Sequence, residues 1–67
     1  MTLTEKQIDT LLYIIEYKTQ HPYPPTRFEI ASHFGISINA VQGRLNMLVK
    51  KEAISLVPNI SRGIVVL

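Results

Sequence analysis

Two short amphipathic segments joined at a glycine constrain this chain more than any other feature. They occupy residues 26–51, TRFEIASHFGISINAVQGRLNMLVKK. Gly35 stands where the first segment must end, and glycine adopts the left-handed backbone of a helix stop without steric cost. Two amphipathic helices around a turn of about three residues form a helix-turn-helix. The pattern therefore predicts helices at residues 27–34 and 38–52.

Both helices carry start signals. Thr26, with Glu29 three residues later, forms a capping-box pattern, in which each side chain accepts a hydrogen bond from the other residue's backbone N–H. Ser37 is a favourable N-cap residue for the second helix. Ile36 before it is placed to pack on Val41 as a hydrophobic staple. Local chemistry thus predicts where each helix begins.

A further helix precedes this pair, at residues 5–19. Thr4 and Gln7 repeat the capping-box pattern at its start. A proline-rich stretch at residues 22–25 ends it, because proline blocks helix at its own position and disfavours it just before. At about 100° per residue, the stripe predicted to be buried is Ile8, Leu11, Leu12, Ile15 and Thr19. The residues expected to point to solvent are Lys6, Asp9, Thr10, Tyr13 and Tyr17.

Two short β-rich runs follow, at residues 54–57 and 64–67, with a loop of turn-forming residues between them. A hairpin after a helix-turn-helix is a wing, and it must lean on the helices because an isolated hairpin is marginally stable in water. The predicted buried side of the helix at residues 38–52 is Val41, Leu45, Leu48 and Val49. The predicted fold class is mainly α with a small β-hairpin: a three-helix winged helix-turn-helix, as one domain over residues 1–67.

Composition argues against several classes of protein. The chain has 67 residues, no cysteine and two isolated histidines, His21 and His33, so neither a disulfide nor a metal or cofactor site is expected. Five acidic residues are spread over three helices, which does not suggest the converging groups of a catalytic pocket. No apolar run approaches a membrane span, and the absence of cysteine fits a cytoplasmic location. We therefore predict a cytoplasmic domain that is not an enzyme.

The polar residues of the helix at 38–52 favour double-stranded DNA as a partner. The net charge of +2 is too small to argue for nucleic acid by itself. The outward side, which we call the amide ridge, consists of Asn39, Gly43, Asn46 and Lys50, flanked by Ala40, Gln42 and Met47. A structural surface helix would usually carry Glu and Lys pairs at a spacing of four, whereas an amide donates and accepts together on an adenine edge. The alternative is a merely polar surface.

Three basic residues support the same interpretation. Arg27 lies in the first turn of its helix, where the dipole favours negative charge, so a cation there is better explained if a phosphate approaches the free N–H groups. Arg62, at the tip of the wing, is expected to contact phosphate or the minor groove. Lys50 either contacts DNA or interacts with the C-terminal end of the helix dipole. Ordinary solvation is the alternative for each of these charges.

Phe28 is the residue that fits this pattern least. It falls roughly opposite the apolar face of the helix at 27–34, so it either packs over Tyr23 or the proline linker, or forms a contact surface for a second subunit or protein. The second possibility leaves a different function open. The chain would then be a winged-helix module for protein–protein interaction that does not bind DNA.

Over nearly its whole length, the chain resembles the N-terminal DNA-binding domain of LexA repressors. The most specific matches are Pro-Pro-Thr-Arg followed by Glu-Ile-Ala within residues 24–31, and Ser-Arg-Gly-Ile at residues 61–64. Further matches are Asn39-Ala40, Leu45, Leu48 and Ile54. The family fold that this implies is a winged helix-turn-helix, in agreement with the pattern of helices and strands.

The resemblance places Asn39, with Ser37 and Ala40 beside it, at the major-groove surface, Arg27 near the DNA backbone and residues 61–63 at the wing tip. With the amide ridge added, the predicted base contacts are Ser37, Asn39, Ala40, Gln42, Gly43 and Asn46. The predicted backbone or wing contacts are Thr26, Arg27, Lys50, Ser61, Arg62 and Gly63. The predicted partner is double-stranded DNA with paired half-sites.

The chain departs from the family pattern in three ways. The turn around Ile36 and Ser37 is one residue shorter than in the enterobacterial members. Gln42 and Gly43 occupy positions where those members carry acidic residues, so their operator sequence does not transfer. The self-cleaving peptidase domain of LexA is missing, as is an Ala-Gly cleavage dipeptide. We expect either a natural stand-alone regulator or a fragment of a longer repressor.

Overall fold

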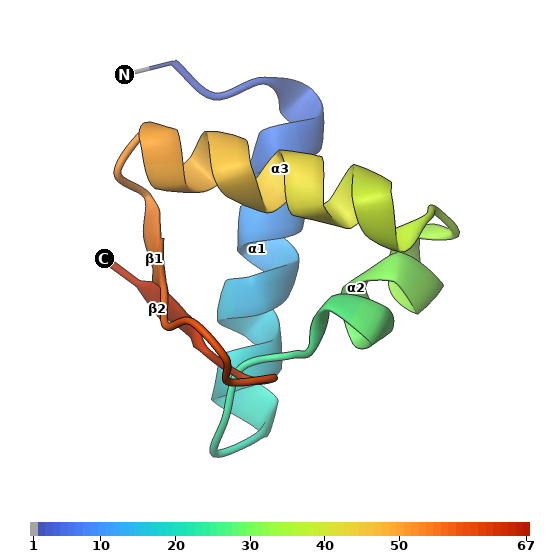
Figure 1. Ribbon diagram of the computed structural model, residues 1–67, viewed down its shortest axis with the longest axis vertical. Coiled ribbons are helices and arrows are strands. Elements are labelled where there is room, and N and C mark those ends of the chain that lie inside the picture. Colours follow the sequence, from blue (N-terminus) through green and yellow to red (C-terminus); the bar gives the residue numbers. More distant parts are fainter. Residues whose placement is uncertain (1) are drawn as a thin grey trace.

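The computed structural model describes residues 2–67. Its elements in this range are the helices α1 (Glu5–Gln20), α2 (Arg27–Phe34) and α3 (Ile38–Lys50), and the strands β1 (Ile54–Leu56) and β2 (Ile64–Val66). In Figure 1, α3 crosses α1, with α2 to the right and the hairpin to the left. This arrangement is the predicted winged helix-turn-helix.

The helix starts and the first helix stop follow from local signals. Thr4 and Thr26 are N-caps, and each completes its capping box, with Gln7 and Glu29 respectively. Gly35 ends α2 in the left-handed conformation, at φ +65°. The predicted start and end of α2 are therefore confirmed, and so is the predicted start of α1.

The end of α3 differs from the prediction of residue 52. Glu52 has a left-handed backbone, with φ +60°. Its N–H donates to Val49 O at 3.0 Å, and the N–H of Ala53 donates to Leu48 O at 2.9 Å. These two bonds form a helix stop that usually contains glycine, so the residue type gave no signal for it. The strands are each one residue shorter than predicted, and α1 extends one residue further, to Gln20.

The core lies where the three helices meet the hairpin. Its buried apolar residues are Ile14, Ile30, Ala31, Val41, Leu45, Leu48, Ile54 and Ile64. Three of these, Val41, Leu45 and Leu48, confirm the predicted buried side of α3. Val49 was also predicted to be buried, but it is 38% exposed, because it lies at the edge of that side rather than within it.

The predicted face of α1 is largely wrong. Of the five residues expected to be buried, Leu11 packs partly buried against the core, but Thr19 is exposed, and so are Ile8 by 42%, Leu12 by 56% and Ile15 by 38%. The residues of α1 that are buried instead are Gln7, Thr10 and Ile14. The helix is thus rotated relative to the face that its apolar side chains suggested, and two polar side chains point inward.

Hydrogen bonds to α3 and its C-cap explain this rotation. Thr10 Oγ1 donates to a carbonyl one turn earlier at 2.8 Å and accepts from Arg44 Nη1 at 3.3 Å. Gln7 Oε1 accepts from Lys51 Nζ at 2.8 Å. A buried polar group destabilises the fold only when it lacks such a partner. Both partners are distant in sequence, so the periodicity of α1 alone could not reveal them.

The hairpin is short and leans on the helices as expected. Its antiparallel register pairs Ile54 with Val66, Ser55 with Val65, and Leu56 with Ile64. Ile54 and Ile64 are buried and anchor it to the core. At the end of the loop between the strands, a Cβ on Gly63 would lie 2.6 Å from the carbonyl oxygen of Val57. Only glycine fits there without a shift of the backbone.

Two further features are absent from residues 2–67: a membrane-spanning helix and a group of metal-binding side chains. None of the helices there has the length and apolar character needed to cross a lipid bilayer. Nor do histidine, aspartate and glutamate side chains in this range gather into a group of three that could hold a metal ion.

Candidate nucleic-acid interface

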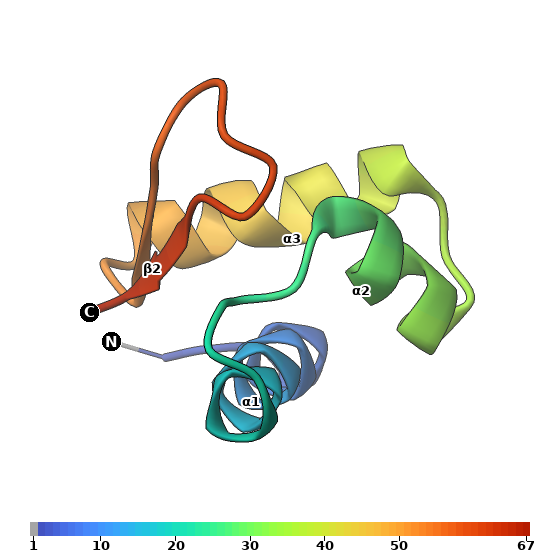
Figure 2. The same cartoon turned by 90° about the horizontal axis from the view of Figure 1, so that it is seen from below.

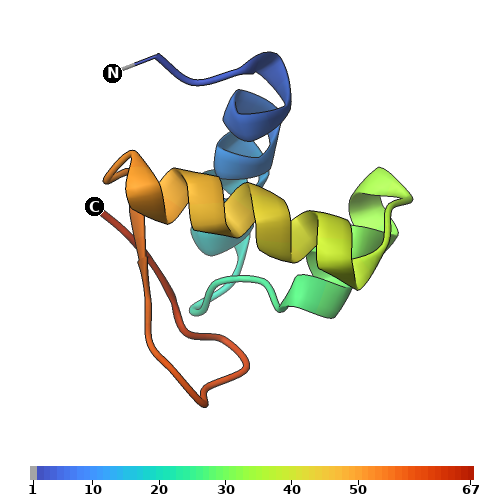
Figure 3. The same cartoon turned by 45° about the horizontal axis from the view of Figure 1, so that its top comes forward.

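The outer side of α3 and the wing loop, residues 57–63, face the same way. Figure 2 shows α1 on one side of α3 and this loop projecting on the other. Because Val41, Leu45 and Leu48 are buried, the opposite side of α3 is the one that the loop flanks. Figure 3 shows the loop toward the C-terminal, orange half of α3, whereas the green helix α2 lies at the opposite, N-terminal end.

The predicted ridge is accessible to a ligand. Its exposed residues are Asn39, Ala40, Gly43, Asn46 and Lys50, with Ser37 exposed just before the helix. Gln42 is half-buried. Ser37 is also the N-cap, since its Oγ accepts a hydrogen bond from the N–H of Ala40 at 3.1 Å. All six predicted base-contact residues therefore lie on or beside one surface of α3.

A chain of side-chain hydrogen bonds, the Arg27 relay, joins α2 to this surface. Arg27 Nη1 donates to Gln42 Oε1 at 2.7 Å. Gln42 Nε2 in turn donates to Asn46 Oδ1 at 2.9 Å. The predicted phosphate-contacting residue Arg27 is thus bonded directly to Gln42 and linked through it to Asn46, a connection that the sequence did not indicate.

An open groove separates the relay from the wing loop. Its volume is about 400 Å³, and its lining includes Arg27, Gln42 and residues 56–61. The side chain of Leu45 also contributes, although its exposed fraction is only 1%. The groove therefore lies between the two regions expected to meet DNA, directly over the core.

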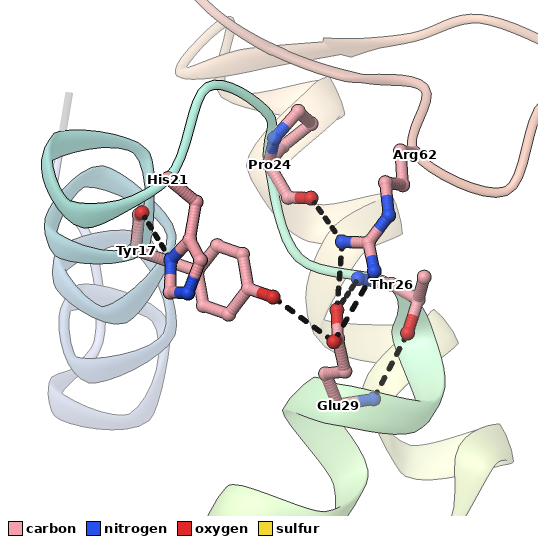
Figure 4. Close-up of polar contacts among 6 residues, drawn as sticks. All are labelled: Tyr17, His21, Pro24, Thr26, Glu29 and Arg62. Atoms are coloured by element: carbon pink, nitrogen blue, oxygen red, sulfur yellow. Dashed lines mark hydrogen bonds and ion pairs between the residues drawn. The ribbon is translucent and has the colours of Figure 1, made fainter.

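Arg62 points inward from the wing rather than outward from its tip (Figure 4). Its Nη1 donates to Glu29 Oε1 at 2.9 Å and to Pro24 O at 2.8 Å, and its Nη2 donates to Glu29 Oε2 at 3.3 Å. The guanidinium carbon lies 4.2 Å from the centre of the Tyr23 ring. We call these contacts, with the Tyr17 and Thr26 bonds described below, the Arg62 cluster.

Glu29 is the centre of the Arg62 cluster. Its carboxylate also accepts from the Thr26 N–H at 2.8 Å and from the Tyr17 hydroxyl at 2.9 Å. The hydrogen bonds from Arg62, and next the one from Thr26, lower the pKa of Glu29 to about 2. Both side chains of the ion pair retain 35% exposure, so water screens their attraction. The cluster ties the wing to the start of α2 and to α1.

The other predicted contact residues around the wing fall into two groups. Ser61 and Lys50 are exposed. Gly63 is buried close to Val57, so the fold requires a glycine at this position whether or not it contacts DNA. The Thr26 hydroxyl is occupied as the N-cap of α2. That these residues and Arg62 contact DNA stays a prediction.

Phe28 is 72% exposed. The expectation that it packs over Tyr23 or the proline linker is therefore wrong. The face of the Tyr23 ring is instead approached by the guanidinium of Arg62, which the sequence interpretation had placed at the wing tip. Whether Phe28 contacts a second subunit or protein stays a prediction.

One signal in the sequence could have revealed the Arg62 cluster. Glu29 lies in the first of the two most specific motifs, within residues 24–31, and Arg62 lies in the second, residues 61–64. Two residues that form a pair in the fold must both be present in the chain. The occurrence of both motifs was therefore compatible with a contact between Glu29 and Arg62. The Arg27 relay had no comparable signal, because Gln42 and Asn46 lie outside both motifs.

Comparisons with known proteins agree with this geometry. The family model of the LexA DNA binding domain matches residues 1–63. The LexA repressor of Marinobacter nauticus is 46% identical over 65 residues, which is 96% of this chain and 32% of the relative. The LexA repressors of Hahella chejuensis and Thiobacillus denitrificans are 46% and 48% identical over 63 residues, covering 92% of this chain and 32% of each relative. The chain thus spans about a third of the length of these relatives.

Proposed function

Because the chain belongs to the LexA DNA-binding domain family, we propose that it binds double-stranded DNA in a sequence-specific manner and serves as the DNA-binding part of a transcriptional repressor. The observation that carries this proposal is that the amide ridge is exposed on α3 and that the wing loop projects on the side of α3 away from α1 (Figure 2). A helix with an exposed polar side, flanked by a projecting loop, offers two adjacent points of contact to a duplex.

In the proposed complex, α3 enters the major groove. That groove is about 12 Å wide in B-DNA and admits one helix. The N-terminal end of a recognition helix contacts base edges, and here that end carries Asn39. The proposed base contacts are Ser37, Asn39, Ala40, Gln42, Gly43 and Asn46.

Contacts to the DNA backbone surround these base contacts. We propose that Lys50 and Arg27 approach phosphates on either side of the ridge, with Thr26 and the N–H groups at the start of α2 nearby. The wing loop would reach the neighbouring backbone or minor groove through Ser61, Gly63 and the part of Arg62 that remains exposed.

One such module covers only one half-site. Specific binding is then expected to use two copies on half-sites about 34 Å, or one helical turn, apart. We expect the free protein to be monomeric, and sedimentation at micromolar concentration measures this directly. If it sedimented as a dimer, Phe28→Ala would show whether the exposed ring forms the dimer contact.

The test of DNA binding compares two variants on two duplexes. Fluorescence anisotropy is measured at two salt concentrations with a duplex selected from a random library and with an unselected duplex. Asn39→Ala should remove about 1–3 kcal/mol of discrimination between the duplexes while leaving the salt dependence unchanged. Lys50→Ala should weaken binding to both duplexes and lower the salt slope by about 0.9.

Two outcomes would contradict the proposal. If Asn39→Ala preserved the full preference for the selected duplex, the base-reading surface would not lie at the N-terminal end of α3. If the parent protein bound neither duplex even at low salt, a protein-interaction module would become the better explanation.

A further inference from the structure

The polarity of the Arg27 relay is fixed by chemistry. A guanidinium has five N–H donors and no acceptor. The Gln42 atom that lies 2.7 Å from Arg27 Nη1 must therefore be its oxygen, Oε1. The Gln42 nitrogen is then directed to the other side, where it lies 2.9 Å from Asn46 Oδ1. Rotating either amide by half a turn would bring two donors or two acceptors together.

This polarity determines which atoms are left for a ligand. Arg27 and Gln42 occupy one lone pair on each of the two amide oxygens. The unused donors are the second N–H of Gln42 Nε2 and both N–H groups of Asn46 Nδ2. The surface formed by Gln42 and Asn46 therefore presents three N–H donors and one remaining lone pair on each of the two oxygens, so donors outnumber acceptors, whereas in the free amides they are balanced.

Asn39 provides a contrast on the same helix. Among the side-chain hydrogen bonds of residues 2–67, none holds the Asn39 amide in one orientation. It is free to turn and so can donate and accept together, as an adenine edge requires. Two parts of one ridge thus differ in the base chemistry they suit.

We propose that Arg27 is a positioning residue that makes Gln42 and Asn46 select guanine over adenine at the base pair they face. Guanine presents two neighbouring acceptors in the major groove, N7 and O6, whereas adenine presents one acceptor and one donor. A surface with more donors than acceptors can satisfy both guanine atoms, and it favours a donor rather than an acceptor opposite the adenine amino group. This inference rests on the proposed function, since it assigns specificity to the same surface.

The Arg27 relay lies at the surface, and this matters for its effect. Arg27 and Asn46 are exposed and Gln42 is half-buried, so in free protein water competes for each bond. When a duplex covers α3 and excludes water, an unpaired donor against the adenine amino group is no longer solvated, and the mismatch becomes costly. The relay therefore acts on the choice of base rather than on the stability of the fold.

The experiment first locates the base pair and then changes the relay. Binding of parent and Asn46→Ala to single-substitution variants of the selected duplex identifies the base pair at which Asn46 matters. At that pair the parent should prefer guanine over adenine by roughly 10- to 100-fold. Arg27→Gln replaces the pure donor with an amide that can turn, and should reduce this preference to within about threefold while the preference dependent on Asn39 persists.

Lys50→Gln is the matched control, because it also removes one positive charge from the same surface but does not touch the relay. It should weaken binding to all duplexes and leave the guanine preference unchanged. The inference is overturned if the parent prefers adenine at the identified pair, or if Arg27→Gln and Lys50→Gln affect the guanine preference equally. Failure of the parent to bind any duplex would instead refute the proposed function itself.

Discussion

Two arginines, Arg62 of the wing loop and Arg27 at the start of α2, each bond a side chain of another element, but the two arrangements differ. Arg62 meets the carboxylate of Glu29 in a half-exposed ion pair that also includes a backbone carbonyl. Arg27 is exposed and meets the neutral amide of Gln42. The first arrangement fixes where a loop lies, whereas the second fixes which atoms of a neighbouring side chain face outward. A cation on a surface proposed to contact DNA thus need not act as a simple phosphate contact.

The largest effect is expected when a core side chain that lies beneath both regions is shortened. Leu45 is 1% exposed and lines the groove between the wing loop and the Arg27 relay. Leu45→Ala should lower the free energy of unfolding by about 2–5 kcal/mol. Urea denaturation followed by circular dichroism measures this loss. A melting temperature within a degree or two of the parent would show that neither region depends on this side chain.

The next largest effect should be confined to the wing. In Gly63→Ala the new Cβ would lie 2.6 Å from Val57 O and 3.0 Å from Ile60 O. Overpacking of this kind typically lowers stability by about 1–3 kcal/mol. Thermal denaturation gives the loss, and side-chain amide NMR signals of Gln42 and Asn46 should stay in place. Equal changes in both regions would mean that the wing and the relay are coupled.

The pH dependence of stability should distinguish the Arg62 cluster from the Arg27 relay more directly. Glu29 has a pKa lowered from 4.5 to about 2 in the folded protein, so its ion pair stabilises the fold above pH 4.5, and that stability is lost as the pH falls toward 2. Glu29→Gln keeps a residue able to form the capping box but removes the carboxylate. Its unfolding free energy should vary less with pH than that of the parent across this window.

This acid-dependent contribution should be modest because the ion pair is half-exposed and screened. The Arg27 relay contains no carboxylate, so Gln42→Ala should leave the pH dependence of stability unchanged. If the unfolding free energies of the parent and of Glu29→Gln changed in parallel with pH, the role assigned to Glu29 would be contradicted.

The smallest expected effect has the opposite sign. A Cβ on Gly43 would meet nothing within 4 Å, and alanine is favoured over glycine inside a helix by about 0.5–1 kcal/mol. Gly43→Ala should therefore raise the melting temperature. If Gly43 approaches a base as proposed, the same variant should bind the selected duplex less well. A gain in stability with unchanged affinity would remove Gly43 from the base-contacting surface.

Local signals in the sequence predicted much of the fold. The two capping boxes and Gly35 depend on residues within four positions of each other, so their chemistry is complete in the sequence. The apolar spacing of α3 predicted three of its four proposed core residues correctly, because this side packs against α1, α2 and β1. The stop at Glu52 was missed because the residue type is unusual for a left-handed backbone.

Contacts between distant residues account for most of what the sequence did not reveal. The face of α1 was mispredicted because Thr10 is satisfied by Arg44, which lies 34 residues away. The orientation of Arg62 depends on Glu29, which lies 33 residues away. The position of the amide ridge was predicted correctly, but the Arg27 relay that orders two of its side chains was not.

The separation of the ridge from the core has an evolutionary consequence. Substitutions at exposed positions usually change stability by no more than about 0.5 kcal/mol, and a Cβ added at Gly43 would meet no atom within 4 Å. If this side of α3 reads DNA as proposed, a lineage could exchange its residues and acquire a new set of target genes without first losing the fold. Selection on the regulatory network and selection on folding would act on different residues of the same helix.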